Sequence, residues 1–248
     1  MKNSNRKKLG VISGMGTRAG LLFIDKLINS IEAPTDQDFP EFILHNNSQI
    51  PDRTLSIIYG QESPENELLR SIELMNACDV DFMVSTCITS HHFLGQLSSR
   101  ITKNFINPID LVVRELVEHP YYINKVGLLA TTGTITSGLF HRKFENTNIE
   151  LVTLNSEDQE SKFMKSVYMK GGLKSSQITP DAYSLFEEAV DRLKMQQPDV
   201  IIGGCTEVQI GLQNLDIDFH YIDVIDVLVQ EIIEKMNLKV KEKLTCLI

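Results

Sequence analysis

Two cysteines occur at matching places in the sequence. Cys87 follows the apolar run in "DFMVSTCIT", and Cys205 follows a similar run in "DVIIGGCTE". Each run indicates a buried strand, and a helix is expected to begin just after each cysteine, at Thr89 or Ser90 and at Thr206. The start of a helix offers free N–H groups and a partial positive charge. That environment binds carboxylates and favours the thiolate form of a cysteine.

Two thiols on opposite sides of one small molecule can invert a stereocentre. One thiolate removes the proton from one face of the carbon, and the other thiol delivers a proton to the opposite face. The roles exchange in the reverse direction, so the two groups titrate as a coupled pair. The alternative is that both thiols are inert packing, as buried cysteines commonly are. Their symmetric placement favours catalysis, whereas Cys78 and Cys246 are interpreted as non-catalytic.

The sequence contains no motif for a metal or a nucleotide cofactor. Its four cysteines lack the CxxC spacing typical of zinc or dithiol sites. The segment "GMGT" at residues 14–17 lacks both the GxGxxG pattern and the lysine of a phosphate-binding loop. We therefore predict no metal and no cofactor.

The elements that must position the thiols alternate between strands and helices. Short runs rich in Val, Ile, Leu and Phe, without polar alternation, are typical of strands covered on both faces. Such alternation predicts an α/β protein with parallel sheets. Strands are expected at 8–13, 41–45, 80–86, 124–131, 149–154, 198–203 and 218–223, and helices at 19–31, 63–77, 179–196 and 224–236.

The chain also repeats itself once. "KLGVISGMGT" at 8–17 matches "KVGLLATTGT" at 125–134 with an offset of 117, and the two cysteine segments match with an offset of 118. We infer two pseudosymmetric α/β halves, with residues 1–107 plus about 223–248 in one and 108–222 in the other. The chain crosses over near Asn107, and the last helix is expected to pack back on the first half. Because ligands bind at the carboxyl ends of parallel strands, both cysteines should face one cleft between the halves.

Composition narrows the class of protein. The 248 residues carry a net charge of −9, which argues against a nucleic acid or an anionic membrane as partner. No signal peptide and no apolar run long enough to span a bilayer is visible. These features predict a cytoplasmic protein with reduced thiols that acts on a small molecule.

Four motifs together resemble the cofactor-independent aspartate/glutamate racemase family. They are "SGMGT" at 13–17, "NSQIPDRT" at 47–54, "CITSH" at 87–91 and "GCTE" at 204–207. The resemblance implies two flavodoxin-like or Rossmann-like halves, a homodimer, and no pyridoxal phosphate. It implies interconversion of L- and D-aspartate, or of glutamate, with Cys87 and Cys205 as the two acid/base residues. In relatives the first cysteine usually serves the D-enantiomer and the second the L-enantiomer.

The same resemblance implies a set of residues that bind the acidic amino acid. Arg53 would hold the side-chain carboxylate, a task that suits its planar fork, and Lys170 in "YMKGG" would be a second basic residue. Each residue also has an alternative interpretation without a role in binding. Arg53 could be an exposed arginine in a loop, and Lys170 could cap the C-terminus of a helix. His91 and His92 are expected on the helix after Cys87 and are not predicted to exchange protons with substrate. The complete predicted binding set is Met15, Arg53, Ile88, Thr89, Thr131, Lys170, Thr206 and Glu207.

One departure from the family pattern leaves the substrate open. Ile88 stands where the family has an asparagine after the first cysteine, so an apolar side chain replaces an amide. A less polar substrate would fit such a site, as in the related hydantoin racemases, maleate isomerases and arylmalonate decarboxylases. A non-catalytic amino-acid-binding protein that keeps the cleft is a third hypothesis.

Overall fold

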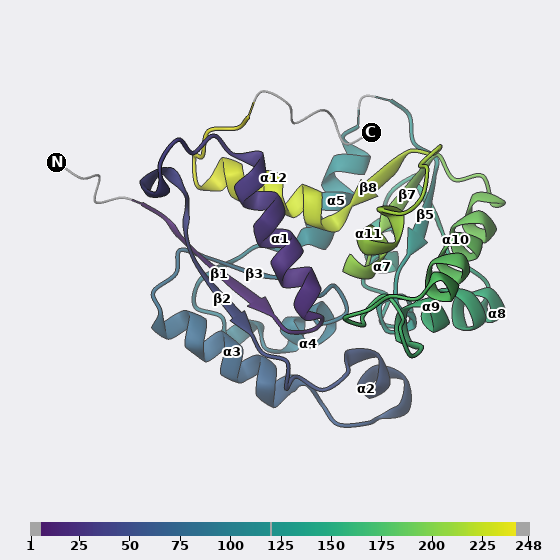
Figure 1. Ribbon diagram of the computed structural model, residues 1–248, viewed down its shortest axis with the longest axis horizontal. Coiled ribbons are helices and arrows are strands. Elements are labelled where there is room, and N and C mark those ends of the chain that lie inside the picture. The colour runs from purple at the N-terminus through teal and green to yellow at the C-terminus, as the bar shows by residue number, and fades with distance from the viewer. Residues whose placement is uncertain (1–5, 120, 242–248) are drawn as a thin grey trace.

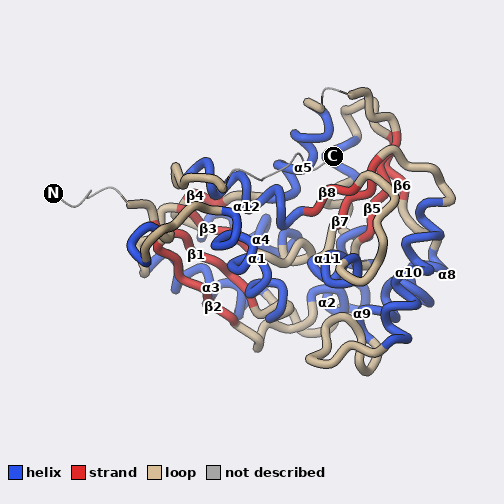
Figure 2. Tube along the Cα trace, turned by 45° about the horizontal axis from the view of Figure 1, so that its top comes forward, coloured by secondary structure: helices blue, strands red, loops and turns tan. Residues whose placement is uncertain are grey.

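The computed structural model describes residues 6–119 and 121–241, and it contains two four-stranded parallel sheets (Figures 1 and 2). The sheets share one strand order, β2-β1-β3-β4 in the first and β6-β5-β7-β8 in the second. This arrangement confirms the predicted α/β fold of two similar halves. The strands are β1 Lys8–Ser13, β2 Glu41–Asn46, β3 Phe82–Ser85, β4 Asn104–Phe105, β5 Lys125–Leu129, β6 Glu150–Val152, β7 Val200–Gly203 and β8 Tyr221–Asp223.

Helices connect the strands of each sheet. The long helices lie close to their predicted ranges, and α10 begins where its Thr-Pro signal indicates, with the Thr179 hydroxyl accepting a hydrogen bond from the Ala182 N–H. A short π-helix at Gln159–Met164 joins α8 to α9. The helices are α1 Thr17–Ser30, α2 Arg53–Tyr59, α3 Glu65–Ala77, α4 His91–Gln96, α5 Pro108–Val117, α6 Thr132–Thr136, α7 His141–Phe144, α8 Ser156–Asp158, α9 Lys165–Tyr168, α10 Pro180–Lys194, α11 Thr206–Leu212 and α12 Val224–Lys235, with 3₁₀ turns at Asp36–Asp38 and Ser98–Arg100.

The internal sequence repeat corresponds to a repeated contact. In the first half the Asp81 carboxylate accepts a hydrogen bond of 2.7 Å from the backbone N–H of Lys8. In the second half the Asp199 carboxylate accepts one of 2.9 Å from the backbone N–H of Lys125. Each aspartate thus ties the start of its own strand to the start of the first strand of its sheet, and this sets the two strands in register.

The last helix, α12, packs against α1 and α5. Asp226 on α12 pairs with Lys26 on α1, and Glu231 lies 2.9 Å from Arg114 on α5. Figure 1 shows α12 alongside α1 and α5. The helix thus contacts α1 of the first half and α5 at the crossover between the halves, and the domain boundaries stay a prediction.

The apolar core includes a cluster that spans both halves. It brings together Leu9 from β1, Val126 from β5 and Ile225 from α12, all of them fully or almost fully buried. Separate apolar clusters lie behind each sheet. The shared cluster fixes the two sheets relative to each other, so the loops at their carboxyl ends meet. Across 6–119 and 121–241, no helix combines the length and the apolar character needed to cross a membrane.

Candidate active site

Cys87 and Cys205 line a single cavity between the two halves. Cys87 lies two residues beyond the end of β3, and Cys205 lies two residues beyond the end of β7 and forms the N-cap of α11. Because β3 and β7 occupy equivalent positions in their sheets, the repeat brings both thiols to the same place. Their exposed fractions are 8% and 7%, so both thiols are almost completely shielded from water.

All but one of the predicted binding residues line this cavity. The exception is Lys170, which is exposed and is not among the cavity residues. Lys174, four residues later, lines the cavity instead, because the chain turns through Gly171 at a φ of 74° and folds back. The full lining comprises Met15, Arg53, Thr54, Cys87, Ile88, Thr89, Thr131, Tyr168, Lys174, Gly204, Cys205, Thr206 and Glu207.

Arg53 is buried at the first turn of α2, with an exposed fraction of 6%. Its guanidinium donates to the backbone carbonyls of Met15 at 2.9 Å and Pro51 at 3.0 Å, so the side chain is held in place before any ligand binds. Burial alone would lower the pKa of Arg53, but the negative charges of Cys87 and Asp52 raise it above its ordinary value. A fixed cation therefore lies beside the first thiol.

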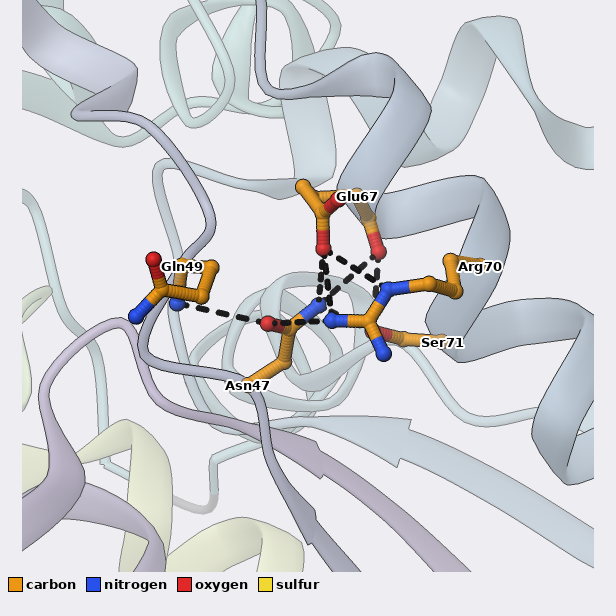
Figure 3. Close-up of polar contacts among 5 residues, drawn as sticks. All are labelled: Asn47, Gln49, Glu67, Arg70 and Ser71. Atoms are coloured by element: carbon orange, nitrogen blue, oxygen red, sulfur yellow. Dashed lines mark hydrogen bonds and ion pairs between the residues drawn. The ribbon is translucent and has the colours of Figure 1, made fainter.

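A buried asparagine holds the loop that leads to Arg53 (Figure 3). The Asn47 amide donates to the Glu67 carboxylate at 2.9 Å, and its oxygen accepts from the Arg70 guanidinium at 2.9 Å. The Asn47 backbone packs so closely against Gly14 that a Cβ on this glycine would lie 2.2 Å from a backbone carbon of Asn47. Gly14 also has a φ of 99°, so the turn before Met15 requires glycine.

The second thiol has a different environment. The Cys205 thiol donates a hydrogen bond of 2.6 Å to the Glu207 carboxylate. Burial and this carboxylate raise the pKa of Cys205 well above its ordinary value, although Lys174 acts in the opposite direction. Burial would also lower the pKa of Lys174, but Glu207 and Tyr168 raise it well above the ordinary value. The site is thus electrostatically asymmetric, with a cation beside Cys87 and a carboxylate beside Cys205.

Threonine hydroxyls join the two halves at the bottom of the cavity. The Thr89 hydroxyl lies 2.8 Å from that of Thr131 and 2.9 Å from that of Thr134. The Thr206 hydroxyl donates to the backbone carbonyl of Thr86 at 3.1 Å, which is a second link between the halves. Gly133 permits α6 to approach Thr54 and Thr89 closely, because a Cβ on this glycine would lie 2.8 Å from the Thr54 hydroxyl. These groups can orient a carboxylate or an ammonium between the thiols.

The two histidines after Cys87 do not line the cavity. His91 is buried, and its Nδ1 lies 3.0 Å from the carbonyl oxygen of Cys87, so it supports the turn that carries the thiol. His92 is half-buried on the same helix. That neither histidine exchanges protons with a ligand stays a prediction.

Beside the cavity lies a contact between α9 and α2 that the sequence did not indicate. The Tyr168 hydroxyl on α9 lies 3.0 Å from the carboxylate of Asp52, the N-cap of α2, and accepts a hydrogen bond of 3.0 Å from Lys174. The cavity volume is about 10 Å³, which is room for about one water molecule. A cavity of this size cannot hold an amino acid, so the residues that line it must move when one binds.

No cluster of three or more His, Cys, Asp or Glu side chains in the described residues could hold a metal ion. Cys78, Cys87 and Cys205 are free thiols, and Cys246 lies outside the described residues. The polar groups that line the cavity are two thiols, two cations, the carboxylate of Glu207 and several hydroxyl groups.

Comparison with known proteins identifies the class. Residues 12–232 match the Asp/Glu/hydantoin racemase family, and the chain therefore belongs to this family. This result confirms the resemblance of the four motifs. The aspartate racemase of Picrophilus torridus has a similar structure, with a TM-score of 0.81 and 27% sequence identity, covering 95% of this chain and 96% of that one.

Two other similar proteins have names that describe different substrate specificities. The broad specificity amino-acid racemase RacX of Bacillus subtilis (strain 168) is 20% identical over 222 residues, which is 87% of this chain and 92% of RacX. The glutamate racemase of Francisella tularensis subsp. tularensis SCHU S4, solved in complex with D-glutamate, shares the fold with a TM-score of 0.61 and 18% identity, over 96% of this chain and 85% of that one.

Proposed function

We propose that this protein is a cofactor-independent racemase that interconverts the L- and D-forms of an acidic amino acid, aspartate first and glutamate second. The observation that carries the proposal is the meeting of Cys87 and Cys205 in one cavity with Arg53 and Lys174. Two opposed thiols supply the acid and the base, and two cations suit a substrate with two carboxylates.

The electrostatic asymmetry assigns a starting state. We assign Cys87, which lies beside the Arg53 guanidinium, the role of base in the first direction, and Cys205, whose thiol donates to Glu207, the role of acid. The thiolate of Cys87 removes the α-proton, and Cys205 delivers its own proton to the opposite face of the planar carbanion. Cys87 is then a thiol and Cys205 a thiolate, which is the state that runs the reaction in reverse. Backbone N–H groups and the threonine hydroxyls stabilise the negative charge on the α-carboxylate.

Loss of the α-proton signal of L- and D-aspartate in D2O, followed by NMR, tests this proposal. We expect both enantiomers to lose the signal far faster than in buffer alone, and chiral chromatography to detect the opposite enantiomer. If exchange stays at background while aspartate raises the melting temperature, the protein is an amino-acid-binding protein and not a racemase.

A second candidate keeps the chemistry and changes the substrate. Ile88 is buried, lines the cavity, and also belongs to the apolar core. An apolar wall beside the first thiol favours a less polar side chain, and the likeness to a broad-specificity racemase points the same way. A panel of amino acids and 5-substituted hydantoins, analysed by chiral chromatography, separates the two. Higher kcat/KM for an apolar substrate than for aspartate would favour the second candidate.

A further inference from the structure

A second cavity of about 300 Å³ lies at the junction of the two halves, and it shares no lining residue with the catalytic cavity. It lies between α4, β4 and the start of α5 on one side and the segment around α7 on the other. His91, which contacts the backbone of Cys87, is part of its wall. The volume matches the lower end of the range for small-molecule pockets.

The walls of this cavity are mainly apolar. Leu94, Ile101, Phe105 and Leu139 line it, and the ring of Phe105 lies 5.6 Å from that of His91. Such walls bind the apolar or aromatic body of a ligand by removing it from water.

The rim of the cavity is basic although the whole chain is acidic. Lys103, Arg142 and Lys143 line it, and no Asp or Glu is among the described residues that do so. Lys103 and Lys143 pair with Asp79 and Asp110. Arg142 differs, because its guanidinium donates to the backbone carbonyl of Ser137 at 2.6 Å and has no ion pair with a carboxylate of the described chain. Arg142 is therefore the cation available to an anionic ligand.

His91 contributes an unused hydrogen-bond acceptor. Its Nδ1 lies 3.0 and 3.1 Å from the carbonyl oxygens of Cys87 and Ile88, and since carbonyls only accept, Nδ1 carries the proton. Burial lowers the pKa of His91 to about 4, so the ring is neutral at pH 7 and its Nε2 is an acceptor. Nε2 is buried and has no hydrogen-bond partner within the part of the chain that the structure describes.

We propose that this cavity is an effector site for a small organic anion with an apolar or aromatic body and one hydroxyl group. The carboxylate would bind Arg142, the body would fill the apolar cavity, and the hydroxyl would donate to Nε2 of His91. A donor on Nε2 polarises the ring and strengthens the hydrogen bonds from Nδ1 to the carbonyls of Cys87 and Ile88. The ligand would therefore tighten the turn that carries Cys87 without entering the substrate cavity.

Isothermal titration of the full chain with 4-hydroxyphenylacetate tests the binding step. We expect saturable binding of one molecule per chain. Phenylacetate lacks the hydroxyl and 2-(4-hydroxyphenyl)ethanol lacks the carboxylate, so each should bind about tenfold more weakly or worse. Arg142→Glu should abolish binding, and this exposed side chain can be changed without disturbing the core. Lys165→Glu makes the same reversal of charge at an exposed residue beside a different cavity, and it should leave the affinity for 4-hydroxyphenylacetate unaltered.

The effect of the bound ligand on Cys87 is measured by chemical modification and not by enzyme turnover, so the result does not depend on the proposed racemase activity. Peptide mass spectrometry would follow alkylation of Cys87 by iodoacetamide, with Cys78 as the internal reference. Saturating 4-hydroxyphenylacetate should slow the alkylation of Cys87 at least about twofold and leave Cys78 unchanged. The proposal is overturned by any of four results. The first is that 4-hydroxyphenylacetate shows no saturable binding, and the second is that Arg142→Glu binds it as tightly as wild type. The third is that Lys165→Glu loses as much affinity as Arg142→Glu, and the fourth is that bound ligand leaves the rate of Cys87 alkylation unchanged.

Discussion

The thiol of Cys205 donates a hydrogen bond of 2.6 Å to the carboxylate of Glu207, two residues further along α11. Within the described residues no carboxylate accepts a hydrogen bond from Cys87, which lies beside the guanidinium of Arg53. The two halves repeat the same strands and place their cysteines equivalently, yet they surround the two thiols with different charged groups. Five predictions follow from this site and its surroundings.

Removing the charge of Glu207 should change the pH profile of the reaction. Glu207→Gln keeps a hydrogen-bond acceptor for Cys205 but removes the carboxylate that raises the pKa of its thiol. The pair must carry one proton to act in either direction, so the alkaline limb of kcat/KM should move to lower pH for both enantiomers. An alkaline limb that stays in place would show that Glu207 does not control the thiol.

Each cysteine should be required for one face of the substrate. Cys87→Ser and Cys205→Ser should lower racemisation by roughly a thousandfold, because a hydroxyl is a far weaker base than a thiolate. Each variant should still exchange the α-proton of one enantiomer in D2O, the L-form for Cys87→Ser and the D-form for Cys205→Ser. Cys78→Ser, at the end of α3 and outside the cavity, is the matched control and should behave as wild type. Exchange of both enantiomers by either active-site variant would argue against two bases.

Lys174, and not Lys170, should contribute to substrate binding. Lys174→Met removes the cation beside Glu207 and Cys205, so kcat/KM for aspartate should fall at least about tenfold. Lys170→Met changes an exposed side chain outside the cavity and should alter kcat/KM by less than about twofold. Steady-state kinetics of the two variants decides between the lysines, and the opposite ranking would restore Lys170 as the binding residue.

The contact between Tyr168 and Asp52 should limit access to the thiols. Tyr168→Phe removes a hydrogen bond that joins α9 to α2, so the closed state loses about 1 kcal/mol and opens more often. Alkylation of Cys205 by iodoacetamide should then be about fivefold faster. Tyr122→Phe, at a ring that is 78% exposed, is the control and should leave the rate unchanged. Equal rates in wild type and Tyr168→Phe would mean that another contact closes the cavity.

A buried carboxylate away from the thiols should make stability depend on pH. Burial, followed by the nearby Asp226, raises the pKa of Asp223 from 3.8 to about 7. Between these values the folded chain binds more protons than the unfolded chain, so stability falls as pH rises from about 4 to 7, by about 4 kcal/mol at most. Asp223→Asn can still accept from the Ile225 N–H at the start of α12 and has no such titration. In urea unfolding, the free energy of unfolding of Asp223→Asn relative to that of wild type should increase from pH 4 to 7. A difference that stays constant over this range would contradict the raised pKa of Asp223.

Seven of the eight strands in the described part of the chain, the helices α1, α3, α10 and α12, and the equivalence of the two thiols could be predicted from the amino-acid sequence. These features depend on local signals, because buried parallel strands are apolar without alternation and helix starts are marked by residues such as Thr179 and Pro180. The repeat added long-range information, since two pairs of matching segments with nearly the same offset indicate equivalent places in the two halves. Strand β4 went unpredicted because two residues are too few to form a pattern.

Which side chains complete the cavity depends on how distant segments pack together. Lys170 and Lys174 lie four residues apart in the same segment, and the turn at Gly171, together with packing against Tyr168, selects the second. The contact of Tyr168 with Asp52 joins residues 116 positions apart, and the carboxylate beside Cys205 matters because the site excludes water. Such relationships depend on distance and burial, which local sequence patterns do not encode.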